Sequence, residues 1–223
     1  MTVEDHPTTR AGLLAIIDSQ PDVRVCCEAA SPQEALTLLE QSQADLLITD
    51  LSMPGRSGLA FVREAHEASP RLPILVLSMH DELIYAERCL KAGARGYLMK
   101  DSGLARLMEV IRILLSGGSY VSPSVTARLV DAVSGRRPRG STSPIETLSN
   151  REFEVFCLFG HGLGTKETAC TLGISPKTVE VYRGHIKRKL QLKDAVTLVH
   201  HAVCWVEGGE LGNRYHAPAL QSA

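Results

Sequence analysis

Two hydrophobic periodicities alternate through the first half of this 223-residue chain, and this alternation limits the possible folds more than any other feature. Short apolar runs lie between helix-length segments whose apolar residues recur every three or four positions. The runs are VRVCCEA (23–29), ADLLITD (44–50), PILVLSM (73–79) and GYLM (96–99), and the helical segments cover 7–19, 31–41, 58–68 and 81–93. Strands that alternate with helices need right-handed crossovers, which cover both faces of a parallel sheet. We therefore predict an α/β fold with a doubly wound, mainly parallel sheet.

Composition narrows the class of protein. With 44% apolar residues the chain can bury one core and part of a second, which predicts one or two domains. Its apolar runs are shorter than the roughly 18 to 20 residues that span a bilayer, and MTVEDHPTTR lacks the features of a secretion signal. We expect a cytoplasmic protein without a membrane partner. The cysteines lack metal-site or disulfide spacing and are interpreted as small apolar residues: Cys26, Cys27, Cys89, Cys157, Cys170 and Cys204.

Charge and linker composition divide the chain. Acidic residues outnumber basic ones in 1–116, whereas basic residues are in excess in 149–207 and concentrate in RGHIKRKL (183–190). Between them, SGRRPRGSTSPIE (134–146) is typical of a flexible joint. We predict a first domain over 1–116, a linker over 117–145 with a helix at about 123–133, a second domain over 146–207 and a tail over 208–223.

Polar side chains gather where the predicted strands end. Glu4 and Asp5 follow a very short first run, Asp50 ends the run at 44–50, Ser78 lies near the end of the next and Lys100 follows the last. One strand-end Asp more often caps a turn than performs chemistry. Several carboxylates brought to one sheet edge would repel one another unless a cation joins them, and oxygen ligands suit Mg²⁺. Such a site favours a phosphoryl group, which the metal, Lys100 and Ser78 would share.

These residues, in VEDHP, TDLSMPGRSG, VLSMHDE and GARGYLMKD, resemble the receiver domain of two-component response regulators over about the first 115 residues. The resemblance implies a five-stranded, flavodoxin-like sheet and phosphorylation of one aspartate by a phosphohistidine of a sensor histidine kinase. It also implies the role of each residue: Asp50 is the phosphoacceptor, Glu4, Asp5, Asp50 and the Ser52 carbonyl bind Mg²⁺, Lys100 and Ser78 bind phosphoryl oxygens, and Tyr97 is the aromatic switch residue. Ser52 and His80 border the same opening, so we expect them to tune the lifetime of the phosphate.

The chain departs from this family at its first strand. A strand of about five or six apolar residues is the usual length before the acidic pair, and only Thr2 and Val3 are present here. We expect a mis-assigned or truncated start; the alternative is a shortened central strand and a weakened domain.

The second half has helical periodicity throughout. Ser149 and Glu152 form a capping-box start, and a short turn at Gly173–Ser175 joins two helices, the second of which runs from about Pro176 to Leu190. LSNRE, GLGTKE, LGISPKTVE and IKRKL resemble the DNA-binding domain of the NarL/FixJ (LuxR-type) regulators. The resemblance implies a C-terminal all-α helix-turn-helix domain that binds double-stranded DNA. It also implies that a last helix, from about Asp194 to Glu207, pairs with its copy in a homodimer on DNA.

A helical wheel sorts the second helix of this motif into two faces. Val179, Tyr182, Ile186 and Leu190 would pack inward. The opposite face would enter the major groove and comprises Lys177, Glu180, Val181, Gly184 and Arg188, with Lys187 on its flank. Thr178 is also predicted to bind DNA. A carboxylate cannot bind phosphate, so we expect Glu180 to accept a hydrogen bond from cytosine N4. Gly184 would let the helix approach DNA closely, although drift explains a glycine equally well.

We therefore predict a transcription factor controlled by phosphorylation, which catalyses only its own phosphorylation and dephosphorylation. One rival is a haloacid-dehalogenase-type phosphotransfer enzyme, which also uses a strand-end aspartate; that class expects a second Asp two residues later, where this chain has Ser52. The other rival is a receiver that acts without DNA, which leaves the basic helix at 183–190 unexplained.

Overall fold

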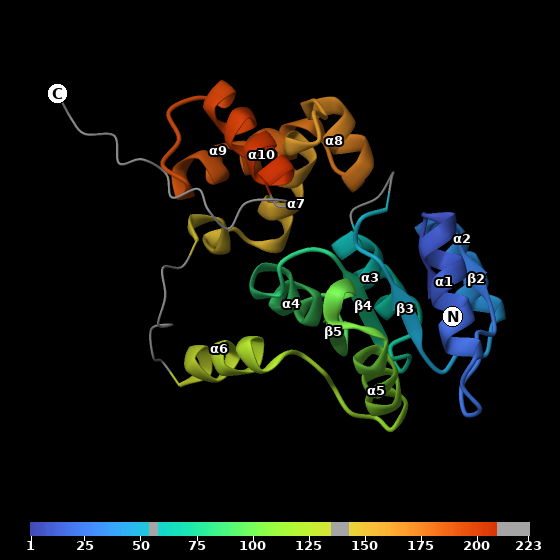
Figure 1. Cartoon of the computed structure of the whole chain (residues 1–223). Helices are drawn as coiled ribbons and strands as arrows, with labels where there is room; N and C mark the ends of the chain where they lie inside the picture. Colours follow the sequence, from blue (N-terminus) through green and yellow to red (C-terminus); the bar gives the residue numbers. More distant parts are fainter. Residues whose placement is uncertain (54–57, 135–142, 209–223) are drawn as a thin grey trace. The chain divides into compact units, whose positions relative to one another are not determined.

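The computed structural model describes residues 1–53, 58–134 and 143–208. The chain forms two compact units, Met1–Ser143 and Pro144–Ala223, which we treat separately (Figure 1). Of the helices that the described residues form, none has the length and hydrophobicity needed to cross a bilayer. The Met-Pro-Gly bend beyond Met53, most of the predicted joint at 134–146 and the tail beyond Gly208 lie outside the described residues.

The first unit is built on a parallel sheet, as the alternating periodicity predicts, and the sheet has the five strands that the family resemblance implies. The strand order is β2-β1-β3-β4-β5, so β1 lies inside the sheet and β2 and β5 form its edges. The strands are β1 (Thr2–Val3), β2 (Glu28–Ala29), β3 (Leu47–Thr49), β4 (Ile74–Ser78) and β5 (Gly96–Met99). Because all strands run the same way, their carboxyl ends meet at one edge of the sheet, where Glu4, Asp50, Ser78 and Lys100 lie.

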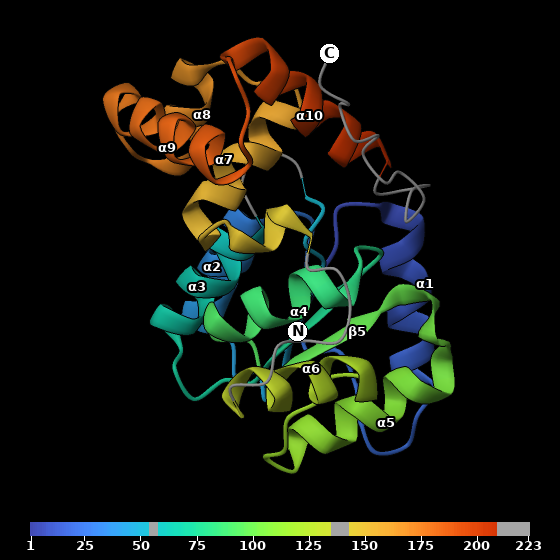
Figure 2. The same ribbon diagram turned by 90° about the vertical axis from the view of Figure 1, so that its left-hand side faces the viewer.

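Helices cover both faces of the sheet (Figure 2). Leucines and isoleucines of α1 and α5 pack with Ile48, Leu75 and Leu98 into one core layer. The opposite face is covered by α2, α3 and α4, which pack in sequence along the sheet. The helices are α1 (Pro7–Asp18), α2 (Pro32–Gln41), α3 (Gly58–Ala68), α4 (Glu82–Lys91) and α5 (Leu104–Leu115), with a 3₁₀ turn, η1, at Lys100–Ser102.

The first strand has only two residues, and backbone hydrogen bonds hold it on both sides. Thr2 N–H donates to Cys27 O and Glu4 N–H to Ala29 O, both at 3.1 Å. On the other side, Asp50 N–H donates to Val3 O at 3.1 Å. Because β1 is hydrogen-bonded to β2 on one side and to β3 on the other, two residues are enough to place Glu4 beside Asp50.

The second strand is shorter than predicted. The run at 23–29 has strand composition, yet only Glu28 and Ala29 form β2. A strand extends only as far as its neighbour offers hydrogen-bonding groups, and the single neighbour of β2 is the two-residue β1. Length, in this case, is set by the partner and not by local composition.

A further helix, α6 (Pro123–Val133), follows α5 at the predicted position and belongs to the first unit. The Ser122 hydroxyl caps it by accepting from Val125 N–H at 3.2 Å, and Pro123 occupies its first turn. Val125 is buried, and α6 packs against α4.

The second unit is all helical, as predicted. After a 3₁₀ turn, η2, at Pro144–Thr147, its helices are α7 (Asn150–Gly160), α8 (Thr165–Leu172), α9 (Pro176–Lys189) and α10 (Ala195–Gly208). Ser149 and Glu152 form the predicted capping box. Gly173 ends α8 in the left-handed region, with φ of 64°, which makes the tight turn into α9 possible. α7 packs against both α9 and α10.

The six cysteines differ in burial, on which the sequence made no prediction. All six are free thiols and Cys89 is buried, but Cys26, Cys170 and Cys204 are exposed. The spacing of the cysteines in the sequence does not predict their burial. Burial depends on the face of the helix or strand on which each cysteine lies.

Gly160 should be required where α7 meets α10. A Cβ at this position would lie 2.5 Å from the backbone oxygen of Ala202, so Gly160→Ala must force the helices apart. We expect the substitution to lower the free energy of unfolding by about 1 to 3 kcal/mol. Gly184 is the matched control, because a Cβ there meets no atom; Gly184→Ala should stabilise the free protein by about 0.5 to 1 kcal/mol. Urea unfolding followed by circular dichroism measures both, and equal effects would contradict the packing argument.

Candidate functional site

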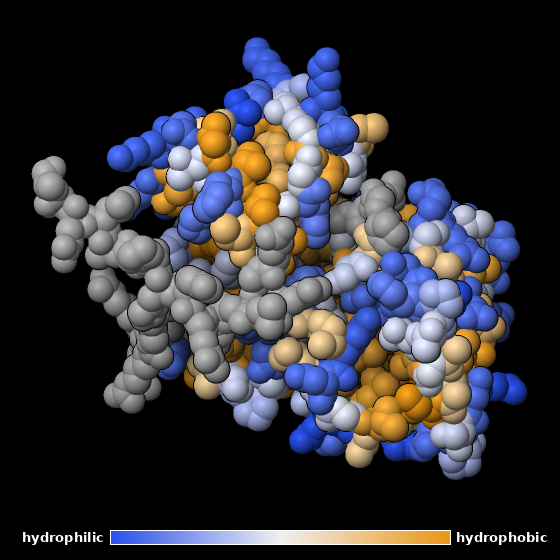
Figure 3. Space-filling view, turned by 45° about the horizontal axis from the view of Figure 1, so that its top comes forward, coloured by the Kyte–Doolittle hydropathy of each residue, from blue (hydrophilic) through white to orange (hydrophobic). Residues whose placement is uncertain are grey.

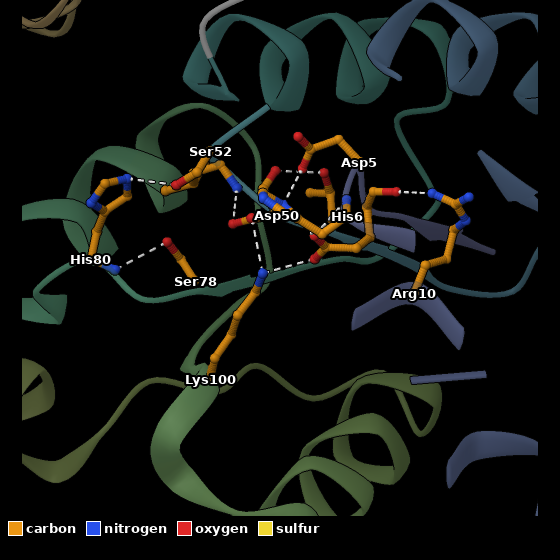
Figure 4. A network of polar contacts seen from close by, with 11 residues as sticks. Asp5, His6, Arg10, Asp50, Ser52, Ser78, His80 and Lys100 are labelled. Carbon is orange, nitrogen blue, oxygen red and sulfur yellow. Dashed lines mark hydrogen bonds and ion pairs between the residues drawn. The ribbon is translucent and has the colours of Figure 1, made fainter. Parts of the chain in front are cut away.

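Lys100 connects the carboxyl ends of separate strands (Figure 4). Its Nζ donates to Glu4 Oε2 at 2.7 Å and to Asp50 Oδ2 at 2.9 Å. Both carboxylates are buried, with Glu4 only 2% and Asp50 only 5% exposed. The structure therefore brings together three residues that are far apart in the sequence, and it does so at the edge where the sequence predicted them.

The charge of Lys100 is stabilised by this arrangement. Burial lowers the pKa of its ammonium, but the hydrogen bonds to Glu4 and Asp50 outweigh burial and the pKa is raised. The ammonium therefore stays charged at neutral pH while it lies in a partly buried position. A buried carboxylate is tolerable only when it is paired and hydrogen-bonded, and Lys100 supplies this pairing to two of them at once.

The backbone of β3 orients Asp50. Its amide donates to Val3 O at 3.1 Å, and its Oδ1 accepts from the amide of Leu51 at 2.6 Å. Thr49 donates its hydroxyl to the Asp50 carbonyl at 2.8 Å. The Leu51 amide, just beyond β3, thus holds one carboxylate oxygen of Asp50, and Lys100 contacts the other.

Acidic side chains beside Asp50 form a candidate cation site. Ligand atoms of Glu4, Asp5 and His6 lie within 4.8 Å of one another. His6 Nδ1 is 3.0 Å from Asp5 Oδ1, and His6 N–H donates to Glu4 Oε1 at 3.2 Å. Asp50 is not part of this cluster, although Lys100 connects it to Glu4. Sequence reasoning did not select His6, whose only signal is its place directly after the acidic pair.

Ser78 and Tyr97 both contact the segment that follows β4. Ser78 is fully buried, and its Oγ accepts from His80 N–H at 3.2 Å. Tyr97 is 1% exposed and donates its hydroxyl to His80 O at 2.7 Å. Burial raises the pKa of the Tyr97 hydroxyl, so the group remains a neutral donor. Both side chains therefore depend on the position of the backbone at His80.

Ser52 and His80 meet across the opening of the site (Figure 4). Ser52 Oγ lies 2.9 Å from His80 Nε2, and the His80 ring stacks on Tyr85 at a centroid distance of 4.5 Å. The stacking fixes the imidazole plane. The structure thus brings the two residues that we expected to tune the phosphate lifetime into direct contact.

The candidate DNA-binding surface lies on α9. Val179 and Ile186 are fully buried, as the wheel predicts, whereas Tyr182 and Leu190, which were also predicted to pack inward, are of intermediate exposure. On the opposite face the structure exposes Lys177, Val181 and Arg188 and leaves Thr178, Gly184 and Lys187 partly exposed. Ser175 caps the helix and holds Thr178 through its amide, at 3.1 Å, and its hydroxyl, at 2.8 Å.

Glu180 is engaged within the protein. It accepts from the Thr165 hydroxyl of α8 at 3.0 Å, and its other carboxylate oxygen lies 2.6 Å from Arg183 Nη2. Sequence reasoning missed both partners, because an i,i+3 ion pair and a contact between helices depend on rotamers and packing. Recognition of cytosine by Glu180 stays a prediction, and it requires one of these bonds to open.

Lys189, a basic residue of α9, contacts residues of the second unit and does not lie on the predicted groove-facing surface. Its Nζ lies 2.6 Å from Glu152 Oε2 and donates to Thr147 O at 3.1 Å. Glu152 also accepts from Ser149 N–H at 2.7 Å. Burial raises the pKa of Glu152, but the hydrogen bonds from Lys189 and Ser149 outweigh it and the pKa is lowered. One basic residue of the run at 183–190 is therefore structural.

Two protein families match this chain, one over the region of the Asp50 site and one over the region of the candidate DNA-binding surface. The response regulator receiver domain matches residues 1–112, and the bacterial regulatory proteins of the luxR family match residues 146–202. The chain belongs to the two-component response regulators of the NarL/FixJ type. It is thus a DNA-binding transcriptional regulator, in which a receiver domain precedes a LuxR-type domain.

Relatives and solved structures agree with this family. The oxygen regulatory protein NreC of Staphylococcus carnosus (strain TM300) is 37% identical over 204 residues, which cover 90% of this chain and 94% of NreC. RcsB of Salmonella enterica serovar Typhimurium, bound to promoter P1flhDC, is similar with a TM-score of 0.71 and 25% identity over 90% of this chain and 96% of RcsB. A LuxR-family response regulator from Aurantimonas sp. SI85-9A1 is 31% identical, with a TM-score of 0.56 over 60% of this chain and 96% of that protein.

The Glu152 contacts should make the second unit sensitive to acid. A carboxyl group whose pKa is lowered by folding stabilises the folded state above its unfolded pKa of about 4.3, and this contribution is lost as the pH falls through the folded value. We expect Glu152→Gln to lower the free energy of unfolding by about 1 to 3 kcal/mol at neutral pH. The difference from wild type should shrink toward pH 3. Thermal unfolding at several pH values measures it, and a difference independent of pH would contradict the role given to the Glu152 charge.

Proposed function

We propose that Asp50 accepts a phosphoryl group from a phosphohistidine of a sensor histidine kinase and that this controls DNA binding. The observation that carries the proposal is the contact between Asp50 Oδ2 and Lys100 Nζ, 2.9 Å, at the carboxyl edge of the sheet. In the transfer, the bond between phosphorus and the histidine nitrogen breaks and a bond from an Asp50 oxygen to phosphorus forms. Lys100, already charged, would bind an oxygen of the transferred group and offset its charge.

The donor set at this edge fits Mg²⁺. At this edge of the sheet, Glu4, Asp5 and Asp50 bring three negative charges, and Lys100, which contacts Glu4 and Asp50, brings one positive charge. A divalent cation would balance the remaining charge, and carboxylate oxygens are the ligands that Mg²⁺ takes. Glu4, Asp5, Asp50 and the Ser52 carbonyl would hold the ion, with His6 beside them. Bound there, Mg²⁺ would neutralise charge on the phosphoryl oxygens.

Ser78 and Tyr97 would convert phosphorylation into a movement. A phosphoryl group on Asp50 attracts the Ser78 hydroxyl, which now accepts from His80 N–H. Displacement of the backbone at His80 also moves the acceptor of the Tyr97 hydroxyl. The region from β4 to β5 would then rearrange as a two-state element.

The protein would catalyse only its own phosphorylation and dephosphorylation. A haloacid-dehalogenase-type enzyme needs an acid two residues after the nucleophile, and this position holds Ser52, whose hydroxyl lies 2.9 Å from His80 Nε2. We propose that Ser52 and His80 set the access of water to the phosphorylated Asp50 and so its lifetime. The rigid stacking of His80 on Tyr85 supports this role.

The partners proposed for the second half are double-stranded DNA and a second copy of the chain. Solved structures of RcsB include a complex with promoter rprA and two dimers bound to two parallel DNAs. In this chain, α10 exposes Val196 by 79% and Val199 by 40%. Figure 3 shows hydrophobic patches among the hydrophilic side chains of one face. An exposed apolar helix face supports pairing of two α10 helices, and two inverted half-sites in the operator.

The proposed organisation keeps the sequence-based boundaries. Residues 1–116 receive the phosphoryl group, 117–145 link the domains, 146–207 bind DNA and 208–223 form a tail. The groove-facing surface comprises Lys177, Thr178, Glu180, Val181, Gly184, Lys187 and Arg188, and the exposure of Lys177, Val181 and Arg188 supports it.

Phosphorylation should be specific for Asp50. With Mg²⁺ and acetyl phosphate, the full chain should gain one acid-stable, base-labile phosphoryl group, and Asp50→Asn should gain none, because an acyl phosphate needs the carboxylate. Asp45→Asn, on a carboxylate outside the site, is the control and should be labelled like wild type. Intact-protein mass spectrometry measures the gain. Label that persists in Asp50→Asn would refute the assignment, and removal of the metal should stop the reaction.

Charge and base recognition on α9 should be separable. Lys177→Ala and Arg188→Ala should weaken binding to every DNA sequence and lower the salt slope by about one unit, since each removes one phosphate contact. Lys91→Ala, in the first unit, is the charge-matched control. Glu180→Ala should shift the preferred base at one position by roughly 1 to 3 kcal/mol. Fluorescence anisotropy with selected operators measures these effects, and an unchanged sequence preference would mean that Glu180 only holds Arg183 and Thr165.

A further inference from the structure

Two adjacent cysteines directly precede β2, and their thiols lie next to each other. Cys26 Sγ is 3.4 Å from Cys27 Sγ. In an extended strand, adjacent side chains point to opposite faces, so neighbouring thiols would be separated. Here the chain bends at Cys26, and β2 begins only at Glu28. The bend, which interrupts the run predicted to be a strand over 23–29, therefore creates a pair of thiols that can bind one ligand together.

Hydrogen bonds hold this bend from both ends. On one side, Val25 N–H donates to Asp18 Oδ1 at 2.8 Å, and the Val25 side chain packs against the core layer of α1 and α5. On the other side, Cys27 O accepts from Thr2 N–H at 3.1 Å. The two thiols are thus held together before any ligand binds. A site that is preorganised in this way loses little conformational entropy on binding.

The two thiols are accessible and differ in acidity. Cys26 is exposed and Cys27 is half-buried. Burial raises the pKa of the Cys26 thiol, but the hydrogen bond with Cys27 is the largest of the effects that outweigh burial, and the pKa is lowered. Burial raises the pKa of the Cys27 thiol and Cys26 raises it further, whereas Ser42 acts in the opposite direction. Because the thiolate is the form that binds soft ions, Cys26 is the thiol that binds first.

The separation of the two sulfur atoms suits a bridging ion better than a disulfide bond. A disulfide has sulfurs about 2.05 Å apart and usually joins Cα atoms about 4.4 to 6.8 Å apart. Adjacent Cα atoms are only about 3.8 Å apart, so a bond between Cys26 and Cys27 would be strained. Two thiolates at about 2.3 Å from one ion lie roughly 3.3 to 3.8 Å apart when their angle at the ion is about 90 to 110°. The observed 3.4 Å lies in this range.

The number of ligands decides which kind of ion fits. A structural Zn²⁺ site takes four protein ligands. Among the residues that the structure describes, the one group of three or more such side chains with ligand atoms close together comprises Glu4, Asp5 and His6, and includes neither cysteine. Cys26 and Cys27 therefore suit an ion that two thiolates satisfy and that prefers sulfur to nitrogen and oxygen.

We propose that Cys26 and Cys27 form a chelating site for one soft, thiophilic ion of the trivalent arsenic class. When a monosubstituted arsenic(III) oxide binds, two arsenic–sulfur bonds form and the arsenic–oxygen bond breaks. The two thiol protons leave with the oxygen as water, and no electrons are exchanged. The organic substituent occupies the third position on arsenic, so no further protein ligand is needed.

A bound ion would fix the bend. With both sulfurs on one ion, Cys26 and Cys27 cannot adopt the extended conformation, and the Cys27 carbonyl stays within reach of Thr2 N–H. Thr2 belongs to β1, which ends directly before Glu4. The ligand would thus strengthen the attachment of β1 to β2. This inference goes beyond the proposed function and does not require phosphorylation of Asp50.

Phenylarsine oxide is the probe for the site. The reduced full-length protein should gain one phenylarsenic group that survives an excess of a monothiol and that a small dithiol removes, as expected of a chelate. Cys26→Ser and Cys27→Ser should each lose this resistant adduct. Cys170→Ser, which removes another exposed thiol, is the matched control and should behave like wild type. Intact-protein mass spectrometry measures the adduct, and its retention in either variant of the pair would overturn the site.

Amide hydrogen exchange measures the effect on the bend. Phenylarsine oxide should slow exchange of the Thr2 amide about threefold or more in wild type, because the ion holds its acceptor, and should leave Cys26→Ser unchanged. An adduct that does not slow this exchange would overturn the fixing of the bend. A wild-type protein that keeps the pair as a disulfide in excess monothiol would overturn the site itself, since no thiolate would remain to bind.

Discussion

The receiver half depends on one interaction, the contact of the Lys100 ammonium with two buried carboxylates. Without this cation, Glu4 and Asp50 would face each other in a place with little access to water, at a cost of several kcal/mol per uncompensated charge. The parallel sheet makes the contact possible, because it sets the ends of β1, β3 and β5 on the same side. Lys100 compensates the charge of the two buried carboxylates. The same ammonium group therefore stabilises the fold and is placed to bind a phosphoryl group.

The sequence predicts most of this arrangement for a physical reason. Hydrophobic periodicity identifies the strands and helices, and strands of a parallel sheet end at one edge, so the residues after β3 and β5 had to approach each other. Capping residues are equally local: Ser149 starts α7 where expected, and α6 begins at the predicted position. Family resemblance, and not periodicity, supplied the role of Tyr97.

Features that depend on a spatial neighbour escaped prediction. The length of β2 follows from the shortness of β1, and the exposure of Cys26 follows from its place before that edge strand. Glu180 was assigned to DNA alone, yet Thr165 on another helix and Arg183 one turn away bind it. On α9, Lys189 is paired with Glu152 of α7, whereas its neighbour Arg188 is exposed on the other face, and the composition of the basic run does not distinguish the two. In each case the property depends on a side-chain rotamer or on a residue distant in the sequence, which the sequence alone does not specify.

A parallel bridge between Gly96 of β5 and Tyr120 has a consequence for contacts between different molecules. A sheet with free edges offers unpaired N–H and C=O groups on which strands of other chains can add, which leads to aggregation. One edge of this sheet is the two-residue β2, too short to template another strand, and the other is β5, whose backbone is bonded to the chain's own Tyr120. The segment that connects the two halves of the protein therefore also keeps its sheet from joining the sheets of its neighbours.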